Sequence, residues 1–152
     1  AGVDLSKQTL LTISVTEDEI DGIGGENIAG AFACMKYFQS LPNDNNKAFV
    51  AAFKKMWGDK TVIGDVTQAA YLGPWLWKYT VEKAGSFDID KVAAATPGVE
   101  FTGAPEGYVK IHPNHHLWSK TRVGLAKLDG QFEVIYETAD LVEPDPFPKG
   151  YQ

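Results

Sequence analysis

The sequence LLTISVTEDEIDGIGGENIAGAFA covers residues 10–33 and gives the clearest indication of the fold class. Leu10–Val15 is a short run of apolar and β-branched residues, which is typical of a buried strand. Thr16 precedes Glu19 by three residues, and this spacing predicts a capping box at the start of a helix or turn. A glycine-rich loop follows, and Asn27–Ala33 predicts a second strand. This order resembles the carboxyl edge of an α/β sheet, where ligands usually bind.

Three helices are expected after this segment. The first runs from about Asn45 to Trp57, where apolar residues recur at helical spacing. Asp65 is a suitable N-cap for a second helix over about 66–84, which Pro74 should kink. Asp88 can cap a short third helix that ends near Ala95.

From residue 99 onward the apolar pattern changes to that of short strands. The predicted strands are Val99–Phe101, Gly107–Ile111, Arg122–Ala126 and Gln131–Tyr136. The tripeptide at 128–130, Leu-Asp-Gly, predicts a hairpin between the last two strands. The proline-rich segment 143–148 is expected to be extended. A self-contained α/β domain would alternate strands and helices more evenly, so the order suggests a piece of a larger fold.

Charge and composition exclude several classes of function. The formal net charge of −6 argues against nucleic acid as a partner, because phosphate backbones attract basic surfaces. No apolar run approaches the roughly 20 residues that a membrane-spanning helix needs. Cys34 is the one cysteine, so no internal disulfide is possible.

Two groups of residues could carry chemistry. His112, His115 and His116 suggest a metal-dependent enzyme, but their spacing fits no zinc signature and the adjacent pair would point to opposite faces of a strand. We therefore expect a structural role for them, and no metal. The acidic run at 17–19 either starts a helix, where carboxylates complement the helix dipole, or contacts a ligand. No nucleophile or phosphate-binding motif is present, so neither catalysis nor a cofactor is expected.

Several strings resemble the solute-binding proteins of urea and short-chain amide ABC transporters. The longest are IGGENIAGAFACMKYFQS at 23–40, NKAFVAAFK at 46–54 and VEKAGSFDIDKV at 81–92. Shorter matches follow in the same order: APEG at 104–107, HHL at 115–117, RVG at 122–124, DGQF at 129–132 and PDP at 144–146. The collinearity over nearly the whole chain makes the resemblance specific.

The resemblance implies an α/β fold, namely a portion of the two-lobe type I periplasmic-binding-protein fold. Its lobes are three-layer αβα sandwiches, and here a C-terminal group of short strands would follow. Residues 1–40 would end the C-terminal lobe, 41–121 would form part of the N-terminal lobe, and 122–152 would supply the last hinge crossing and the C-terminal strands.

The resemblance also implies a function without catalysis. The chain would belong to the extracytoplasmic component of an ABC importer that binds urea, a short-chain amide or a related solute such as a branched-chain amino acid. Its partners would be the solute, the membrane permease subunits, and the missing N-terminal part of the same protein or a second copy. It would lie in the periplasm, associated with the membrane through its transporter. A cytoplasmic amide sensor of the same fold is the alternative.

The resemblance places the ligand at one segment. In the family, the part that matches Ser14, Val15, Thr16, Glu17 and Asp18 reaches the cleft between the lobes. A carboxylate there holds the ammonium group of amino-acid ligands. The side chain of Glu17 or Asp18 would accept N–H bonds from urea or an amide in the same way.

Overall fold

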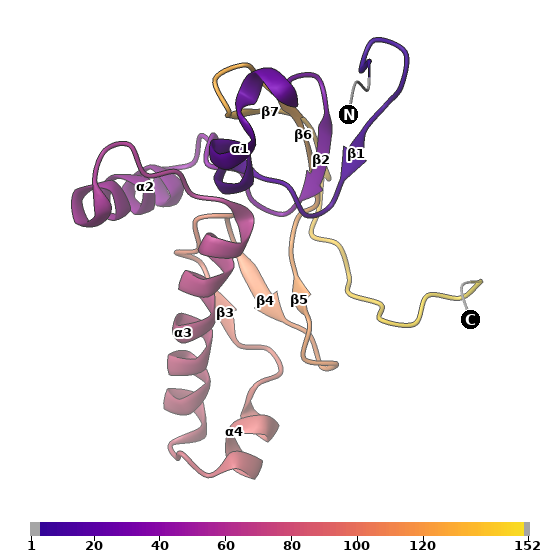
Figure 1. Ribbon diagram of the computed structural model, residues 1–152. Coiled ribbons are helices and arrows are strands. Elements are labelled where there is room, and N and C mark those ends of the chain that lie inside the picture. Colours follow the sequence, from indigo (N-terminus) through magenta and orange to yellow (C-terminus); the bar gives the residue numbers. More distant parts are fainter. Residues whose placement is uncertain (1–3, 151–152) are drawn as a thin grey trace.

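The computed structural model describes residues 4–150 and contains two small sheets with helices around them (Figure 1). The elements in chain order are β1 Leu11–Thr12, α1 Glu17–Ile23, the 3-10 turn η1 Gly25–Asn27, β2 Phe32–Met35, α2 Asp44–Trp57, α3 Asp65–Ala84, α4 Ile89–Ala95, β3 Glu100–Phe101, β4 Val109–Ile111, β5 Leu117–Trp118, β6 Arg122–Ala126 and β7 Phe132–Glu137. Within residues 4–150, no helix is both long enough and apolar enough to cross a bilayer.

The first sheet, called sheet A, has the strand order β1-β2-β6-β7. Strands β1 and β2 are parallel, and the β2–β6 and β6–β7 pairs are antiparallel. The predicted strand over 10–15 is wrong in extent and burial, because only two residues pair and Ile13 is 74% exposed. The predicted strand over 27–33 begins late, because a 3-10 turn and Gly30, with φ of 92°, occupy its first part.

A hydrophobic core lies between sheet A and α1. Phe38 and Phe132 are buried with ring centroids 4.9 Å apart, and Ile20 of α1 belongs to the same cluster. Gly124 of β6 lies under these two rings, and a Cβ added to it would be 2.7 Å from Phe38 Cζ and 2.9 Å from Phe132 Cδ1. The two rings therefore pack directly on the backbone of Gly124, where no side chain fits.

Gly124→Ala should lower the free energy of unfolding by about 1–3 kcal/mol, because the two packed rings would have to move. Gly73→Ala is the matched control, since nothing lies within 4 Å of its added Cβ in the exposed part of α3. That substitution should stabilise by about 0.5–1 kcal/mol, since alanine favours the helix. Thermal unfolding of both variants checks the opposite signs, and equal effects would contradict this view of the core.

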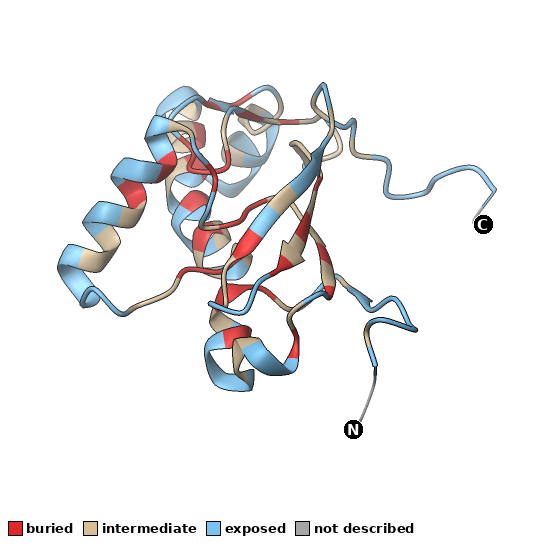
Figure 2. Ribbon diagram, turned by 90° about the horizontal axis from the view of Figure 1, so that it is seen from above, coloured by how far each residue is buried: buried red, intermediate tan, exposed pale blue. Residues whose placement is uncertain are grey.

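The second sheet, called sheet B, has the strand order β3-β4-β5 and packs on α3. Leu72 and Leu76 lie one turn apart on α3 and meet Phe101 and Val109 in one cluster. Strand β5 was not anticipated from the sequence. The second predicted helix is confirmed, and it is continuous through Pro74. Figure 2 shows buried and exposed positions alternating along the helices, as expected for elements with one apolar face.

The predicted caps are partly confirmed. The Asp88 side chain accepts a hydrogen bond from the backbone N–H of Lys91 at 3.1 Å, so it caps α4 as expected. Asp65 is not the N-cap of α3: it is the first helical residue, and Gly64 is the N-cap. The reason is tertiary, because the Asp65 carboxylate accepts a hydrogen bond from the backbone N–H of Tyr37 at 3.0 Å.

The C-terminal part of the chain forms a hairpin in sheet A and then returns to the side of sheet B. The predicted hairpin is confirmed, with Gly130 at φ 78° between β6 and β7. After β7 the chain returns to sheet B, where the Val142 N–H donates to the carbonyl of Ser119 at 2.9 Å. Asn114 Nδ2 donates to the carbonyl of Pro144 at 2.8 Å. Beyond this contact the tail extends away from both sheets (Figure 1).

Candidate functional site

Polar side chains gather where the carboxyl edge of sheet A meets the start of α3. Because β1 and β2 are parallel, both strands end at this edge, and the chain continues into α1 and into residues 36–43. The carboxyl edge of a parallel pair is a common location for ligand sites. We call the group of side chains here the junction cluster; it comprises Thr16, Glu17, Asp18, Lys36, Tyr37, Asp65, Gln68, Glu106 and Arg122.

The N-termini of α1 and α3 face each other in the junction cluster. The predicted capping box is confirmed, with the Thr16 N–H donating to Glu19 Oε2 at 2.7 Å. The N–H of Asp65 donates to Thr16 Oγ1 at 3.3 Å, and Thr67 Oγ1 donates to Asp18 Oδ2 at 3.3 Å. A Cβ at Gly64 would lie 1.9 Å from Asp18 Oδ1, so only glycine permits this approach.

Glu17 is the most deeply buried carboxylate of the cluster, at 1% exposure. Its Oε1 accepts a hydrogen bond from the backbone N–H of Gln39 at 2.7 Å, whereas Oε2 has no partner among the described residues. Burial raises the pKa of the Glu17 carboxyl to about 7, opposed by the hydrogen bond from Gln39 and assisted by the charges of Asp18 and Asp65. The side chain therefore titrates near neutral pH.

Glu106 lies at the opposite end of the cluster, next to the crossing from β5 to β6. Its Oε1 is 3.6 Å from Lys36 Nζ and accepts from Gln68 Nε2 at 3.4 Å. Glu106 Oε2 and Gln68 Oε1 are buried without a partner among residues 4–150. Burial raises the pKa of the Glu106 carboxyl, while the Lys36 ammonium lowers it.

Arg122 joins this end of the cluster to both sheets. It donates from Nη2 to the Glu106 carbonyl at 2.9 Å, from Nη1 to the Lys36 carbonyl, and from Nε to Glu137 Oε2 at 2.6 Å. Beside it opens a cleft of about 480 Å³, which Glu106, Tyr108 and Lys120 also line. Clefts of this size hold small organic ligands.

The junction cluster has an excess of acceptors over free donors. Its four carboxylates, Glu17, Asp18, Asp65 and Glu106, face two cations, Lys36 and Arg122. Burial also raises the pKa of Asp65, opposed by the Lys36 charge and the hydrogen bond from Tyr37. Buried acceptors that lack donors favour a ligand rich in N–H groups, such as an amide or a cation.

The five residues predicted to contact ligand have different positions. Ser14 is exposed, and Val15 packs against the core of sheet A. Thr16 and Glu17 are buried, and Asp18 is half-buried between the two helix N-termini. The structure thus brings Thr16, Glu17 and Asp18 together with the start of α3, and it leaves Ser14 and Val15 outside this group.

Sequence reasoning did not propose the other polar members of the junction cluster as ligand contacts, and it considered Asp65 only as a helix cap. The sequence held only a weak indication that three of them form a site. Lys36, Glu106 and Arg122 are charged residues in otherwise mostly apolar or small-residue strings, namely ACMKYF, GAPEG and RVGLA. Such residues are often exposed, and a contact among three segments so distant along the chain has no local periodicity.

The histidines lie at the β4–β5 turn, away from the junction cluster. His112 Nε2 is 3.2 Å from Glu143 Oε1, and His112 Nδ1 accepts the N–H of Asn114 at 3.2 Å. His116 Nδ1 lies 3.2 Å from the Asn114 carbonyl, and His115 has φ of 68° in the turn. Across residues 4–150, no three or more His, Cys, Asp or Glu side chains are arranged to hold a metal ion.

Solved structures that resemble this fold include solute-binding proteins of ABC transporters. A solute-binding protein from Rhodopseudomonas palustris HaA2, in complex with p-hydroxybenzoic acid, is 27% identical with a TM-score of 0.74 over 88% of this chain and 38% of that chain. An amino acid ABC transporter substrate-binding protein from Pseudomonas fluorescens Pf-5 is 21% identical with a TM-score of 0.75 over 92% of this chain and 39% of that chain. This chain thus spans about two fifths of the length of each.

One relative carries the name of an enzyme and not of a binding protein. The chain is 33% identical over 124 residues to a protein named limonene hydroxylase from Geobacillus stearothermophilus, which covers 82% of this chain and 23% of that protein. The family model described as "Periplasmic binding protein domain" matches residues 1–152. The chain therefore belongs to the periplasmic binding protein domain family, and its α/β architecture is a portion of the type I periplasmic-binding-protein fold, which confirms the fold class expected from the sequence.

Proposed function

We propose that the chain is part of the solute-binding component of an ABC importer. It acts outside the cytoplasm, is associated with the membrane through the permease subunits, and catalyses no reaction. The observation that carries the proposal is the junction cluster, a buried polar group between two sheets at the carboxyl edge of one of them. The 27% identity with the R. palustris solute-binding protein also supports the proposal. The match to the Geobacillus relative spans only 23% of that protein, so we do not propose the hydroxylase activity in its name for this chain.

The two sheets are proposed to lie in two lobes that move about the junction. Sheet A combines strands from residues 1–40 and 122–152, while sheet B lies within 41–121. In this proposal, 1–40 ends the C-terminal lobe, 41–121 forms part of the N-terminal lobe, and 122–152 supplies the last crossing and the C-terminal strands. Closure by a hinge would bring the junction cluster against the solute and exclude water.

The solute is proposed to be urea or a short-chain amide. Such a solute offers N–H donors, and the cluster offers four carboxylates with only two cations, both of which already lie against carboxylate oxygens. Ser14–Asp18 would form one wall of the site, with the half-buried Asp18 among its acceptors. Burial strengthens these hydrogen bonds because water no longer competes for them.

An aromatic carboxylate is the second candidate. The R. palustris HaA2 protein was solved with p-hydroxybenzoic acid, and an anion of that kind would need donors such as Lys36 and Arg122. Binding would then require Arg122 or Lys36 to leave Glu137 or Glu106. This exchange would leave a carboxylate without its cation, so we favour the N–H-rich solute.

Titration calorimetry on the intact protein separates the two candidates. We expect heat of binding with urea, acetamide or formamide, and none with 4-hydroxybenzoate or leucine. Asp18→Asn should weaken binding about 10-fold or more, because it replaces a charged acceptor. Asp21→Asn, on the exposed side of α1, is the control and should leave the affinity unchanged. No heat with any amide, or equal affinities of the two variants, would contradict the proposal.

A further inference from the structure

The cleft of about 480 Å³ beside Arg122 lies among the segments that connect the two sheets. Asn43 lines it from the segment between β2 and α2, Lys120 from the turn between β5 and β6, and Asp140 from the segment after β7. Glu106 lines it from the loop between β3 and β4. A molecule in this cleft would therefore touch every path by which the described chain passes between sheet A and sheet B.

Glu106 is the lining residue with a buried oxygen that lacks a donor within residues 4–150. The residue is 3% exposed. Its Oε1 accepts a hydrogen bond from Gln68 Nε2 at 3.4 Å and lies 3.6 Å from Lys36 Nζ, whereas Oε2 has no partner among the described residues. Buried acceptors are nearly always hydrogen-bonded in native proteins, so we expect a bound molecule to supply the missing donor.

The cations of the cleft are directed elsewhere. Lys120 Nζ and Arg122 Nε each lie 2.6 Å from an oxygen of Glu137. The two other nitrogens of the Arg122 guanidinium donate to the backbone carbonyls of Lys36 and Glu106. The unmet requirement at Glu106 Oε2 is thus an N–H or O–H group, and a cleft of this volume has room for a small organic molecule that carries one.

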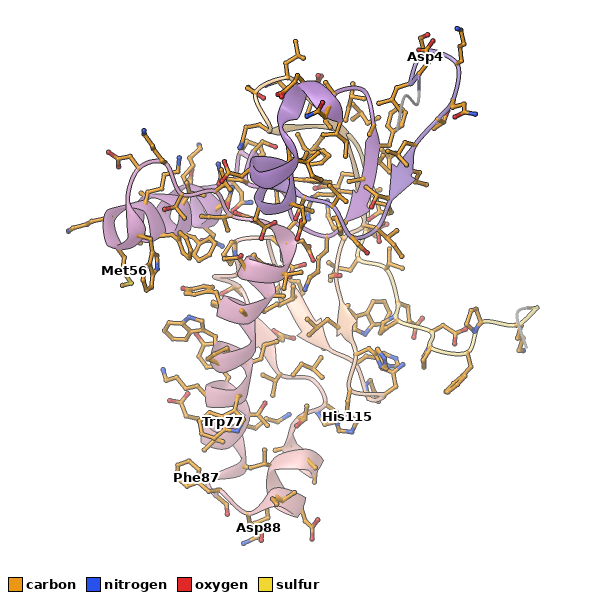
Figure 3. The ribbon with its side chains drawn as sticks, viewed as in Figure 1. Asp4, Met56, Trp77, Phe87, Asp88 and His115 are labelled. Atoms are coloured by element: carbon orange, nitrogen blue, oxygen red, sulfur yellow. The ribbon has the colours of Figure 1, made fainter. Side chains whose placement is uncertain are left out.

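A second hollow, of about 380 Å³, lies between α3 and α4 and lacks such a carboxylate. Trp77 and Phe87 lie next to each other there, with ring centroids 6.0 Å apart, at the end of α3 that is far from the junction cluster (Figure 3). Among the described residues that line this hollow, His115 is the one with an ionisable side chain. A ligand rich in N–H groups therefore finds its carboxylate acceptor in the cleft beside Arg122.

We propose that Glu106 determines the specificity of the solute site, with its Oε2 accepting an N–H group of an amide or urea in the cleft. The inference rests on the proposed function and adds a residue at the end of the junction cluster opposite the Ser14–Asp18 wall. The first turn of α3 joins the two ends, because the Asp65 N–H donates to Thr16 Oγ1 and Gln68 Nε2 donates to Glu106 Oε1.

The comparison of an amide with its acid isolates this role. Acetate has nearly the shape of acetamide, but it brings a second negative charge to the Glu106 carboxylate and has no N–H group to donate. A site built around a hydrogen bond strongly rejects an analogue that cannot form it. The same carboxylate that binds the amide should therefore exclude the acid.

Titration calorimetry on the intact protein at pH 8, with acetamide and acetate as the two ligands, tests the proposal. The unsubstituted protein should bind acetamide at least about 100-fold more tightly than acetate. Glu106→Gln should reduce that ratio at least about 10-fold, because the glutamine amide can donate to acetate. A merely structural effect would weaken both ligands alike. Glu133→Gln, at an exposed position of β7, is the matched control and should keep the ratio.

Glu106→Asp is a second variant, and it keeps the negative charge near Lys36. It should still reject acetate but bind acetamide about 10-fold more weakly, because the shorter side chain withdraws the acceptor. An unchanged ratio in Glu106→Gln, or an unchanged acetamide affinity in Glu106→Asp, would overturn the inference and leave the proposed function standing. Absence of amide binding by the unsubstituted protein would overturn both, so the two failures are distinguishable.

Discussion

Glu17→Gln is expected to raise the free energy of unfolding by about 3 kcal/mol at pH 8 and to change it little at pH 4. In the folded protein, burial raises the pKa of the Glu17 carboxyl from 4.5 to about 7. The folded state therefore binds the proton more tightly than the unfolded state. The stability that this carboxyl contributes is complete below pH 4.5 and is lost as the pH rises through 7. Glutamine stays neutral at every pH, keeps an oxygen for the Gln39 N–H, and so avoids the loss.

Thermal unfolding between pH 4 and pH 8 measures this difference, and it avoids urea, which is a candidate solute. Glu133→Gln is the matched control, because Glu133 is exposed on β7. Its curve should run parallel to that of the unsubstituted protein. If the Glu17→Gln curve were also parallel, the carboxyl would not be held near neutrality by burial, and the account of this end of the junction cluster would be wrong.

Arg122→Ala is expected to lower the free energy of unfolding by about 3–5 kcal/mol. Arg122 is 4% exposed and donates to two backbone carbonyls, those of Lys36 and Glu106, as well as to the Glu137 carboxylate. Truncation removes the guanidinium donor from both carbonyls and leaves Lys120 as the cation next to the Glu137 carboxylate. Arg122→Lys should recover only part of the loss, because an ammonium group cannot reproduce the planar arrangement of donors.

Lys120→Ala controls for the charge alone. Lys120 Nζ lies 2.6 Å from Glu137 Oε1, but its side chain is 31% exposed. Because solvent screens such a pair, the loss should stay below about 1 kcal/mol. Thermal unfolding of both variants compares the two partners of one carboxylate. Similar losses would mean that Arg122 acts only as a surface charge and does not hold the sheets together.

Local patterns in the sequence determined the elements whose signals are self-contained. The helical spacing before Trp57, the Asp88 cap and the Leu-Asp-Gly turn at 128–130 each predicted structure that was confirmed. Strand β6 was predicted with its bounds at Arg122 and Ala126. In each case the residues that cause the structure lie within a few positions of one another, so a single stretch of chain contains the information.

Errors arose where a partner distant in the chain decides the outcome. The apolar run at 10–15 pairs with β2 only at Leu11 and Thr12 and leaves the strand after that, although β2 continues to Met35. Asp65 was expected to cap α3, but its carboxylate is turned toward the N–H of Tyr37 from another segment. Propensity and capping rules describe the isolated chain, and tertiary contacts override them.

Patterns along the chain indicated the family and marked Thr16–Asp18 as a candidate ligand contact. The packing of distant segments buries Glu17 with one oxygen unpaired among the described residues, and it brings Lys36, Glu106 and Arg122 into the same cluster. The physical reason is that hydrophobic periodicity and caps act over one or two turns of chain. A pKa shift or a buried ion pair depends on desolvation by segments up to 86 positions apart, as from Lys36 to Arg122, which only the folded packing brings together.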